Sequence, residues 1–207
     1  LEPQIYHATT QPCILENVIL DDKQRPVFKD LSITQNTRCA YPLSSLPKTH
    51  SSHAPAPNNI IFLCCDLYGV MPTLSLLSQS QAIDYFLTGY TAKVGSTEQQ
   101  SKHDIEPISS PCFGQPFFPL SLDCYAKLLK KRLSEQNTNV WLMNTGWQNA
   151  SYPKGSRHSL ELSKKIVNQI VHGTIGSSTH QVLSELSLNY IQRLPCGTSI
   201  DYEPEWL

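Results

Sequence analysis

The amino-acid sequence predicts an α/β fold, because short apolar runs alternate with segments of helical periodicity. Two runs, 60–65 and 140–143, are apolar on both faces, and we expect 60–65 to be a buried central strand. Each run precedes apolar residues spaced three or four apart, which is typical of a helix packed on a core. We find no internal repeat, and we expect one domain over 1–207.

Three helix starts are marked by capping residues. Ser78 followed by Gln81 fits a capping box, and Gly89 would end that helix. Ser121 and Ser159 are in the N-cap position of two further segments with helical periodicity. The sequence therefore predicts at least three helices flanking the sheet.

Four segments are predicted to be less regular. Residues 1–47 suggest short strands and loops, and residues 44–59, rich in Ser, Pro and His, suggest a surface loop. Residues 95–111 are polar and without periodicity, and loops of that length are often functional. The tail from residue 177 onward shows no clear pattern.

Composition limits the classes of partner and the compartment. The formal net charge of −1 gives no electrostatic case for nucleic acid or an anionic membrane, and no apolar run reaches the length of a membrane span. The seven cysteines are odd in number and include no CxxC spacing, so we expect neither a full disulfide framework nor a zinc ribbon. Cys64, Cys65 and Cys112 fit small core positions. Without a disulfide framework, we expect a reducing, cytoplasmic setting.

A series of short segments resembles, in order, the C-terminal half of ATP-dependent phosphoenolpyruvate carboxykinases. The resemblance covers roughly residues 1–175, and the octapeptide at 86–93 is its most specific part. The segments are Leu15-Glu16-Asn17-Val18, Asn36-Thr37-Arg38 with Tyr41-Pro42, Ile61-Phe62-Leu63 with Asp66 and Gly69, Phe86-Leu87-Thr88-Gly89-Tyr90-Thr91-Ala92-Lys93, Cys112-Phe113-Gly114, Asn144-Thr145-Gly146-Trp147, and Arg157 with Ser159.

The resemblance implies a fold, a reaction and a set of site residues. The fold would be the mixed sheet with flanking helices of the carboxykinase C-terminal domain, here a partial domain without the phosphate-loop segment. The reaction would convert oxaloacetate and ATP to phosphoenolpyruvate, CO2 and ADP, with Mg²⁺ and Mn²⁺ as metals. Arg38 would be catalytic and would contact the terminal phosphate, and residues 95–107 would form a lid. The nucleotide-binding residues would be Glu16, Arg38, Arg157, His158 and Ser163.

Parts that the reaction needs are not found in this sequence. The phosphate cradle of the family is a Gly-rich loop followed by Lys-Thr, and no GxxxxGK[ST] occurs here. The metal ligands also belong to the upstream part of the family, and the loop histidines lack ligand spacing, so we predict no metal site in this chain. His158 stands where an aliphatic side chain usually packs against the base, and Ser163 replaces a Thr. The predicted partners are a nucleotide and a separate chain or segment that carries the phosphate loop.

Alternatives remain open at this stage. Arg38 and Arg157 could be surface or ion-paired arginines, and Asp66 could cap a turn. The chain could be the nucleotide-side part of a carboxykinase, inactive alone. It could instead be a non-catalytic relative that acts as a binding or regulatory module. A nucleotide-binding domain with no carboxykinase partner is the third hypothesis.

Overall fold

The computed structural model describes residues 3–30, 32–33, 37–46, 53–93, 105–200 and 202. The chain divides into two compact units, one built mainly from residues 1–55 and the other mainly from residues 56–207. Each unit is described by itself below. The expectation of a single domain over 1–207 therefore stays a prediction.

The first unit consists of a short helix and two small antiparallel ladders. β1 pairs with β4, and β2 pairs with β3 through a turn closed by the Asp21 carboxylate, which accepts backbone N–H groups of Lys23 and Arg25. The helix was not predicted, and Pro3 at its start suits a first helical turn. The elements are α1 Pro3–Thr9, β1 Ile14–Glu16, β2 Ile19–Leu20, β3 Pro26–Val27, β4 Arg38–Ala40 and the 3₁₀ turn η1 Leu43–Ser45.

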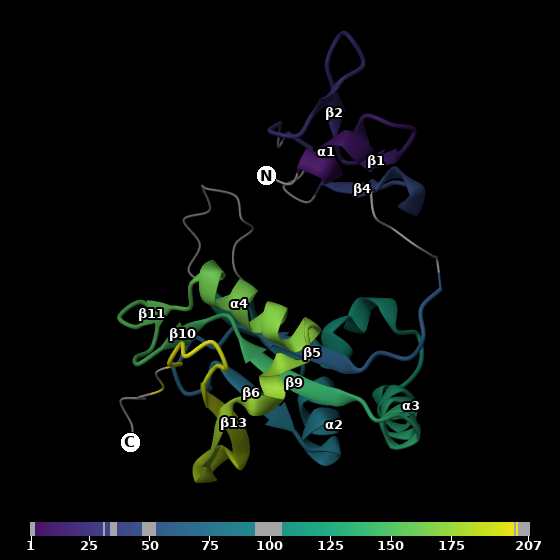
Figure 1. Ribbon diagram of the computed structural model, residues 1–207. Coiled ribbons are helices and arrows are strands. Elements are labelled where there is room, and N and C mark those ends of the chain that lie inside the picture. Colours follow the sequence, from purple (N-terminus) through teal and green to yellow (C-terminus); the bar gives the residue numbers. More distant parts are fainter. Residues whose placement is uncertain are drawn as a thin grey trace. The chain divides into compact units, whose positions relative to one another are not determined.

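The second unit is built on a five-stranded mixed sheet, which confirms the predicted α/β class (Figure 1). Only the β5–β9 pair is parallel, and the other three pairs are antiparallel. The strand order is β12 (Thr179–Leu183), β13 (Leu188–Arg193), β6 (Leu74–Leu77), β9 (Asn139–Asn144) and β5 (Asn59–Cys64).

Helices cover both faces of this sheet. On one face α2 (Gln79–Thr88) and α3 (Leu122–Glu135) bury a cluster around Phe62, Leu142 and Tyr190. On the other face α4 (Leu160–Val171) inserts Ile166 and Ile170 against Leu74, Trp141 and Ile191. Figure 1 shows α4 on one side of the strands and α2 with α3 on the other. Alternate residues of β13, β6, β9 and β5 thus serve different cores, as the two-residue period requires.

Smaller elements lie in the connections of the second unit. β7 pairs with β8, and β10 pairs with β11, each as an antiparallel ladder. The elements are β7 Tyr90–Lys93, β8 Glu106–Ser109, β10 Trp147–Gln148, β11 Ser156–Arg157 and the 3₁₀ turns η2 Pro111–Phe113, η3 Gln115–Phe117, η4 Thr174–Ser177 and η5 Ser184–Leu186.

The predicted helix boundaries are largely confirmed. Ser78 and Gln81 form the reciprocal capping box of α2, and Gly89 ends that helix in the left-handed conformation. The Ser159 hydroxyl accepts the backbone N–H of Leu162 and so caps α4. Ser121 precedes α3 as predicted, but its hydroxyl makes no capping bond there.

Two predictions about strands are wrong. The tail is not irregular, since β12 and β13 form a hairpin that joins the sheet through β6. Among the described residues β5 is not central, because it is the last strand of the sheet, and Leu63 is 54% exposed. An apolar run predicts a strand, but it does not show whether a neighbouring strand lies on each side of it.

The two predicted loops fall partly outside the described residues. In the 95–111 segment, residues 95–104 lie outside them, and β8 occupies 106–109. In the 44–59 segment, residues 47–52 lie outside them, while 53–58 are exposed and without regular structure. Within the described ranges, none of the helices is long and apolar enough to cross a membrane.

Replacing Ile166 with Ala should test the packing of α4. Ile166 is fully buried, so its truncation should lower the free energy of unfolding by about 2–5 kcal/mol. Val171→Ala is the matched control, because Val171 lies on the same helix and is 71% exposed; its effect should stay within about 0.5 kcal/mol. Urea denaturation followed by circular dichroism measures both. Equal losses would contradict the described orientation of α4.

Candidate functional site

The candidate site of the second unit forms where β5 and β9 end. Because the two strands are parallel, the loops after Cys64 and Asn144 leave the same edge of the sheet. Polar side chains from both loops meet there, and ligands of open α/β sheets bind in this position. The sequence analysis had singled out the segments that contain Asp66 and Asn144 without relating the two residues to each other.

Asp66 is fully buried and organises the loop after β5. Its Oδ1 accepts the backbone N–H of Tyr68 at 2.9 Å, and its Oδ2 accepts those of Val70 and Met71 at 2.6 and 2.8 Å. Three backbone donors and a low-dielectric setting make these bonds strong. Asp66 therefore caps the loop, which is the alternative that the sequence analysis left open for it.

Tyr90 adds a fourth donor to the same carboxylate. Its hydroxyl donates to Asp66 Oδ1 at 3.1 Å. Burial, followed by the nearby Asp66 charge, raises the pKa of Tyr90, so the phenol keeps its proton and stays a donor. The start of β7 is thereby tied to the end of β5.

Asn144 joins the two strand ends. Its Oδ1 accepts the backbone N–H groups of Asp66 and Gly146 at 3.0 and 2.8 Å. Its Nδ2 donates to the carbonyls of Met71 and Trp147 at 3.1 and 3.2 Å. The two backbone donors determine the orientation of the amide, since a reversed amide would turn Nδ2 toward them.

Gly146 is required by a close approach of the two loops. A Cβ at this position would lie 2.2 Å from the carbonyl oxygen of Asp66. That same oxygen accepts the backbone N–H of Trp147 at 2.7 Å. Only glycine allows the backbones to come this close, which gives a physical reason for the Asn144-Thr145-Gly146-Trp147 segment.

His158 lies inside this cluster. The ring is buried, and Nε2 lies 3.4 Å from Asn144 Nδ2, which is a donor. The two hydrogens of that amide are already directed at the Met71 and Trp147 carbonyls, so the approach of Nε2 is a packing contact, and Nδ1 is buried without a hydrogen-bond partner among the described residues. Burial lowers the pKa of His158 to about 4, although Asp66 opposes the shift, so the ring is neutral at pH 7.

Arg157 is exposed, and its guanidinium is positioned by contacts with Trp147 and Thr145. It lies opposite Trp147 in the β10–β11 ladder, and its guanidinium stacks over the indole at 5.3 Å from the ring centroid. Its Nε donates to the carbonyl of Thr145 at 3.2 Å. The remaining N–H groups of this guanidinium have no protein acceptor among the described residues, and such a planar fork of donors suits a phosphate.

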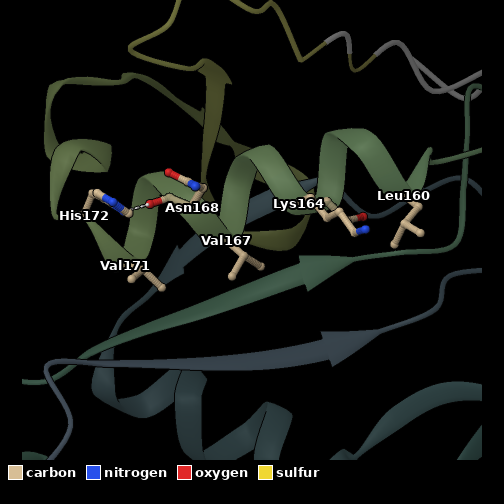
Figure 2. Close-up of a pocket in the computed structure, with 7 residues that line it drawn as sticks. Leu160, Lys164, Val167, Asn168, Val171 and His172 are labelled. Carbon is tan, nitrogen blue, oxygen red and sulfur yellow. Dashed lines mark hydrogen bonds between the residues drawn. The ribbon is translucent and has the colours of Figure 1, made fainter. Parts of the chain in front are cut away.

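Ser163 lies in the first turns of α4, half-buried, with its hydroxyl donating to the carbonyl of Ser159 at 3.3 Å. It borders a shallow groove along one flank of the helix (Figure 2). The groove is lined by Leu160, Ser163, Lys164, Val167, Asn168, Val171 and His172.

Glu16 and Arg38 belong to the first unit and face each other across the β1–β4 ladder. Arg38 Nη1 lies 3.8 Å from Glu16 Oε1, and both side chains are more than half exposed. An exposed pair of this kind contributes at most about 1 kcal/mol of stability. Stabilising the fold is therefore a weak reason for these two residues to be paired. The pairing of these two predicted residues was not anticipated from the sequence.

The structure thus groups the predicted residues in two sets. Glu16 and Arg38 form one pair, and Arg157, His158 and Ser163 lie around the start of α4 in the other unit. The sequence analysis missed Tyr90 and Trp147 as supporting residues, although both stand in segments that it had singled out. Across the described part of the chain, no group of three or more His, Cys, Asp or Glu could hold a metal ion.

These features define an α/β protein whose polar cluster lies at the carboxyl ends of adjacent parallel strands. Comparison with known proteins adds the family. The profile of the family described as phosphoenolpyruvate carboxykinase matches residues 1–196. The chain belongs to the phosphoenolpyruvate carboxykinase family.

Three relatives show how much of such a protein the chain represents. The Phosphoenolpyruvate carboxykinase (ATP) of a Bradyrhizobium species, strain BTAi1, is 41% identical over 84% of this chain and 33% of its own length. The protein of that name from Campylobacter lari is 43% identical, with the same shares. That from Brucella melitensis is 41% identical over 87% of this chain and 34% of its own length. The chain spans about a third of the relatives that it matches.

Asp66→Asn should show how far the site depends on one carboxylate. The amide would turn an NH2 group toward backbone donors and leave at least one of them unpaired. We expect the free energy of unfolding at pH 7 to fall by on the order of 3 kcal/mol. Asp84→Asn, at an exposed position of α2, should change it by less than about 0.5 kcal/mol. Chemical denaturation of both variants measures the difference, and an unaffected Asp66→Asn protein would refute the described network.

His158 should make stability depend on pH. Its pKa is about 4 in the folded chain and ordinarily 6.5, so the unfolded chain binds the extra proton first as pH falls. The contribution of His158 leaves the free energy of unfolding at its full value above pH 6.5. That free energy falls by about 3 kcal/mol as the pH is lowered to 4, and this group changes it no further below pH 4. His158→Leu should flatten the profile of unfolding free energy in that window, whereas His172→Gln, at an exposed position, should leave it unchanged. Parallel profiles for His158→Leu and the wild type would contradict a buried neutral imidazole.

Proposed function

We propose that this chain is the nucleotide-side portion of an ATP-dependent phosphoenolpyruvate carboxykinase. The observation that carries the proposal is the family match over residues 1–196, together with identities of 41% and 43% over 84% of this chain to two ATP-using relatives. In this proposal the conversion of oxaloacetate and ATP to phosphoenolpyruvate, CO2 and ADP belongs to a whole carboxykinase. The chain supplies about a third of it.

Two arginines would bind the phosphates in this reaction. Arg157 is exposed and positioned by Trp147, just before the N-terminus of α4, where the helix dipole also favours an anion. Arg38 is exposed beside Glu16 and would contact the terminal phosphate. Phosphoryl transfer depends mainly on positioning and on neutralising the charge of the transferred group, which is what guanidinium groups provide.

Mg²⁺ and Mn²⁺ do not fit the residues described here. Both metals prefer clusters of oxygen or imidazole ligands, and the described residues include no such group. We therefore assign no step of the reaction to a metal held by this chain. The metals and the Gly-rich phosphate loop would be supplied by the carboxykinase sequence that this chain does not contain.

Without those parts the isolated chain should be inactive. Removing a single group that stabilises developing charge typically costs about a hundredfold or more in rate. The phosphate loop and the metal sites are several such groups. The two arginines of this chain would bind phosphates only weakly without the backbone N–H groups of a phosphate loop around them.

One observation favours a second function, that of a non-catalytic relative acting as a binding or regulatory module. By the family resemblance, position 158 packs against the nucleotide base. Here the His158 ring is buried and directed toward Asn144. A side chain that serves the internal network would be free to change once nucleotide contact was no longer selected.

A chimera separates the two functions. The third of the Campylobacter lari enzyme that this chain matches is replaced by the chain itself, and carboxykinase activity is measured. The proposed function expects activity that Arg38→Ala lowers at least a hundredfold, because a group on the transferred phosphate is lost. Arg25→Ala, an exposed arginine paired with Asp21 in the same unit, should leave activity unchanged. A folded but inactive chimera would favour the module.

Calorimetric titration of Mg-ATP into the isolated chain tests the division of labour. We expect weak binding or none, with any heat reduced by Arg38→Ala or Arg157→Ala but not by Arg25→Ala. Micromolar affinity in the isolated chain would show that the phosphate loop contributes far less than we propose.

A further inference from the structure

β5 presents unused hydrogen-bonding groups along its outer edge. The backbone N–H of Asn139 donates to the carbonyl of Asn58, and that of Thr145 donates to the carbonyl of Cys64. In a parallel ladder every second residue bonds the same neighbour, so Asn58, Ile60, Phe62 and Cys64 face β9. The N–H and C=O groups of the alternate residues 59, 61 and 63 therefore point away from the sheet. In the part of the chain that the structure describes, no strand extends the sheet beyond β5.

The face of β5 beneath α4 is apolar at this edge. Ile61 packs against the cluster that contains Ile166 and Ile170 of α4, and Leu63 lies two residues further along the same face. Leu63 is 54% exposed, whereas its neighbours Phe62 and Cys64, on the other face, are buried. The α4 side of β5 is thus only partly covered.

One flank of α4 is also apolar and uncovered. Leu160 and Val171 are 70% and 71% exposed, and with Val167 they follow the i, i+7, i+11 spacing of one helix face. Figure 2 shows these three side chains projecting from the same side of the helix, along the groove. We refer to Leu63, Leu160, Val167 and Val171 as the α4–β5 shelf.

The opposite flank of α4 has a different neighbour. Glu161, Lys165 and Gln169 border Cys196, which follows β13. Since β13 and β5 lie on opposite sides of β9 in the strand order, the apolar flank faces the β5 side. The exposed backbone edge and the apolar flank therefore belong to one surface of the second unit.

We propose that the α4–β5 shelf is the surface on which the rest of a carboxykinase docks, through a strand added to β5 and an apolar helix laid beside α4. This inference rests on the proposed function. A strand added to β5 would pair with the open backbone N–H and C=O groups. A second helix packed beside α4 would bury its exposed apolar flank. Relatives are three times as long as the matched region, so they contain the chain length to supply both elements.

Amide exchange in the isolated chain tests the shelf directly. At a dilution where the chain is monomeric, the amides of Ile61 and Leu63 should exchange at least a hundredfold faster than those of Ile60 and Phe62. Equal protection of all four would mean that another part of this chain already covers the edge, which would overturn the proposal. Protection that rises with chain concentration would assign the edge to a second copy and would also overturn it.

Binding of the missing sequence tests the occupant. The chain is co-expressed with the two thirds of the Campylobacter lari enzyme that it does not match, and the affinity of the purified complex is measured. Leu63→Lys and Val167→Glu should each weaken binding at least tenfold. Val182→Lys should change it less than twofold, because Val182 is 73% exposed at the opposite edge of the same sheet.

The outcomes keep the two proposals apart. No complex, or equal affinity for Leu63→Lys and Val182→Lys, would overturn the docking surface. An active, Arg38-dependent chimera would still support the proposed function in that case, because a covalent fusion does not need this surface to bring the parts together. A complex that depends on Leu63 without activity in the chimera would instead leave the surface in place and argue against the carboxykinase reaction.

Discussion

The parallel pairing of β5 with β9 is the constraint on which the second unit depends. It brings the loops after Cys64 and Asn144 to one edge of the sheet, where their buried backbone N–H and C=O groups need hydrogen-bond partners. The side chains of Asp66 and Asn144 supply these partners, and together they make eight hydrogen bonds. Once these bonds are made, Gly146 can pass against the Asp66 carbonyl and the chain can turn toward α4. Arg157 and Ser163 are then carried on a rigid support.

Local signals were sufficient for much of this architecture. The capping box at Ser78, the cap at Ser159 and the apolar run at 140–143 predicted α2, α4 and β9, because each pattern contains its own physical cause. The β12–β13 hairpin carried no such signal. It joins the sheet only through the pairing of β13 with β6, which is distant in sequence. The exposed position of Leu63 was equally unpredictable, since exposure depends on the neighbour and not on the residue.

The candidate site shows the same division. Family resemblance selected Glu16 and Arg38 separately, and only the ladder register showed that they are opposite each other. Trp147 had no predicted role, yet it positions Arg157 by stacking, and a stack cannot be deduced from two residues ten apart without the turn that joins them. For His158 the resemblance suggested contact with a base, whereas burial and the Asn144 amide show a ring engaged with the protein interior. Residue types thus indicated which chemical groups are present, and only the structure showed which partners those groups contact.

A folded core and a functional site make different demands on a partial chain. Two helix layers enclose the sheet of the second unit and supply apolar burial on both faces, so folding does not require phosphate-binding groups. Phosphoryl transfer does, because charge on the transferred group must be neutralised from several directions at once. The uncovered edge at Leu63 and the exposed arginines are consistent with this difference. The strand edge offers backbone groups to a further strand, and the arginines offer guanidinium groups to a phosphate whose charge two cations alone would not neutralise.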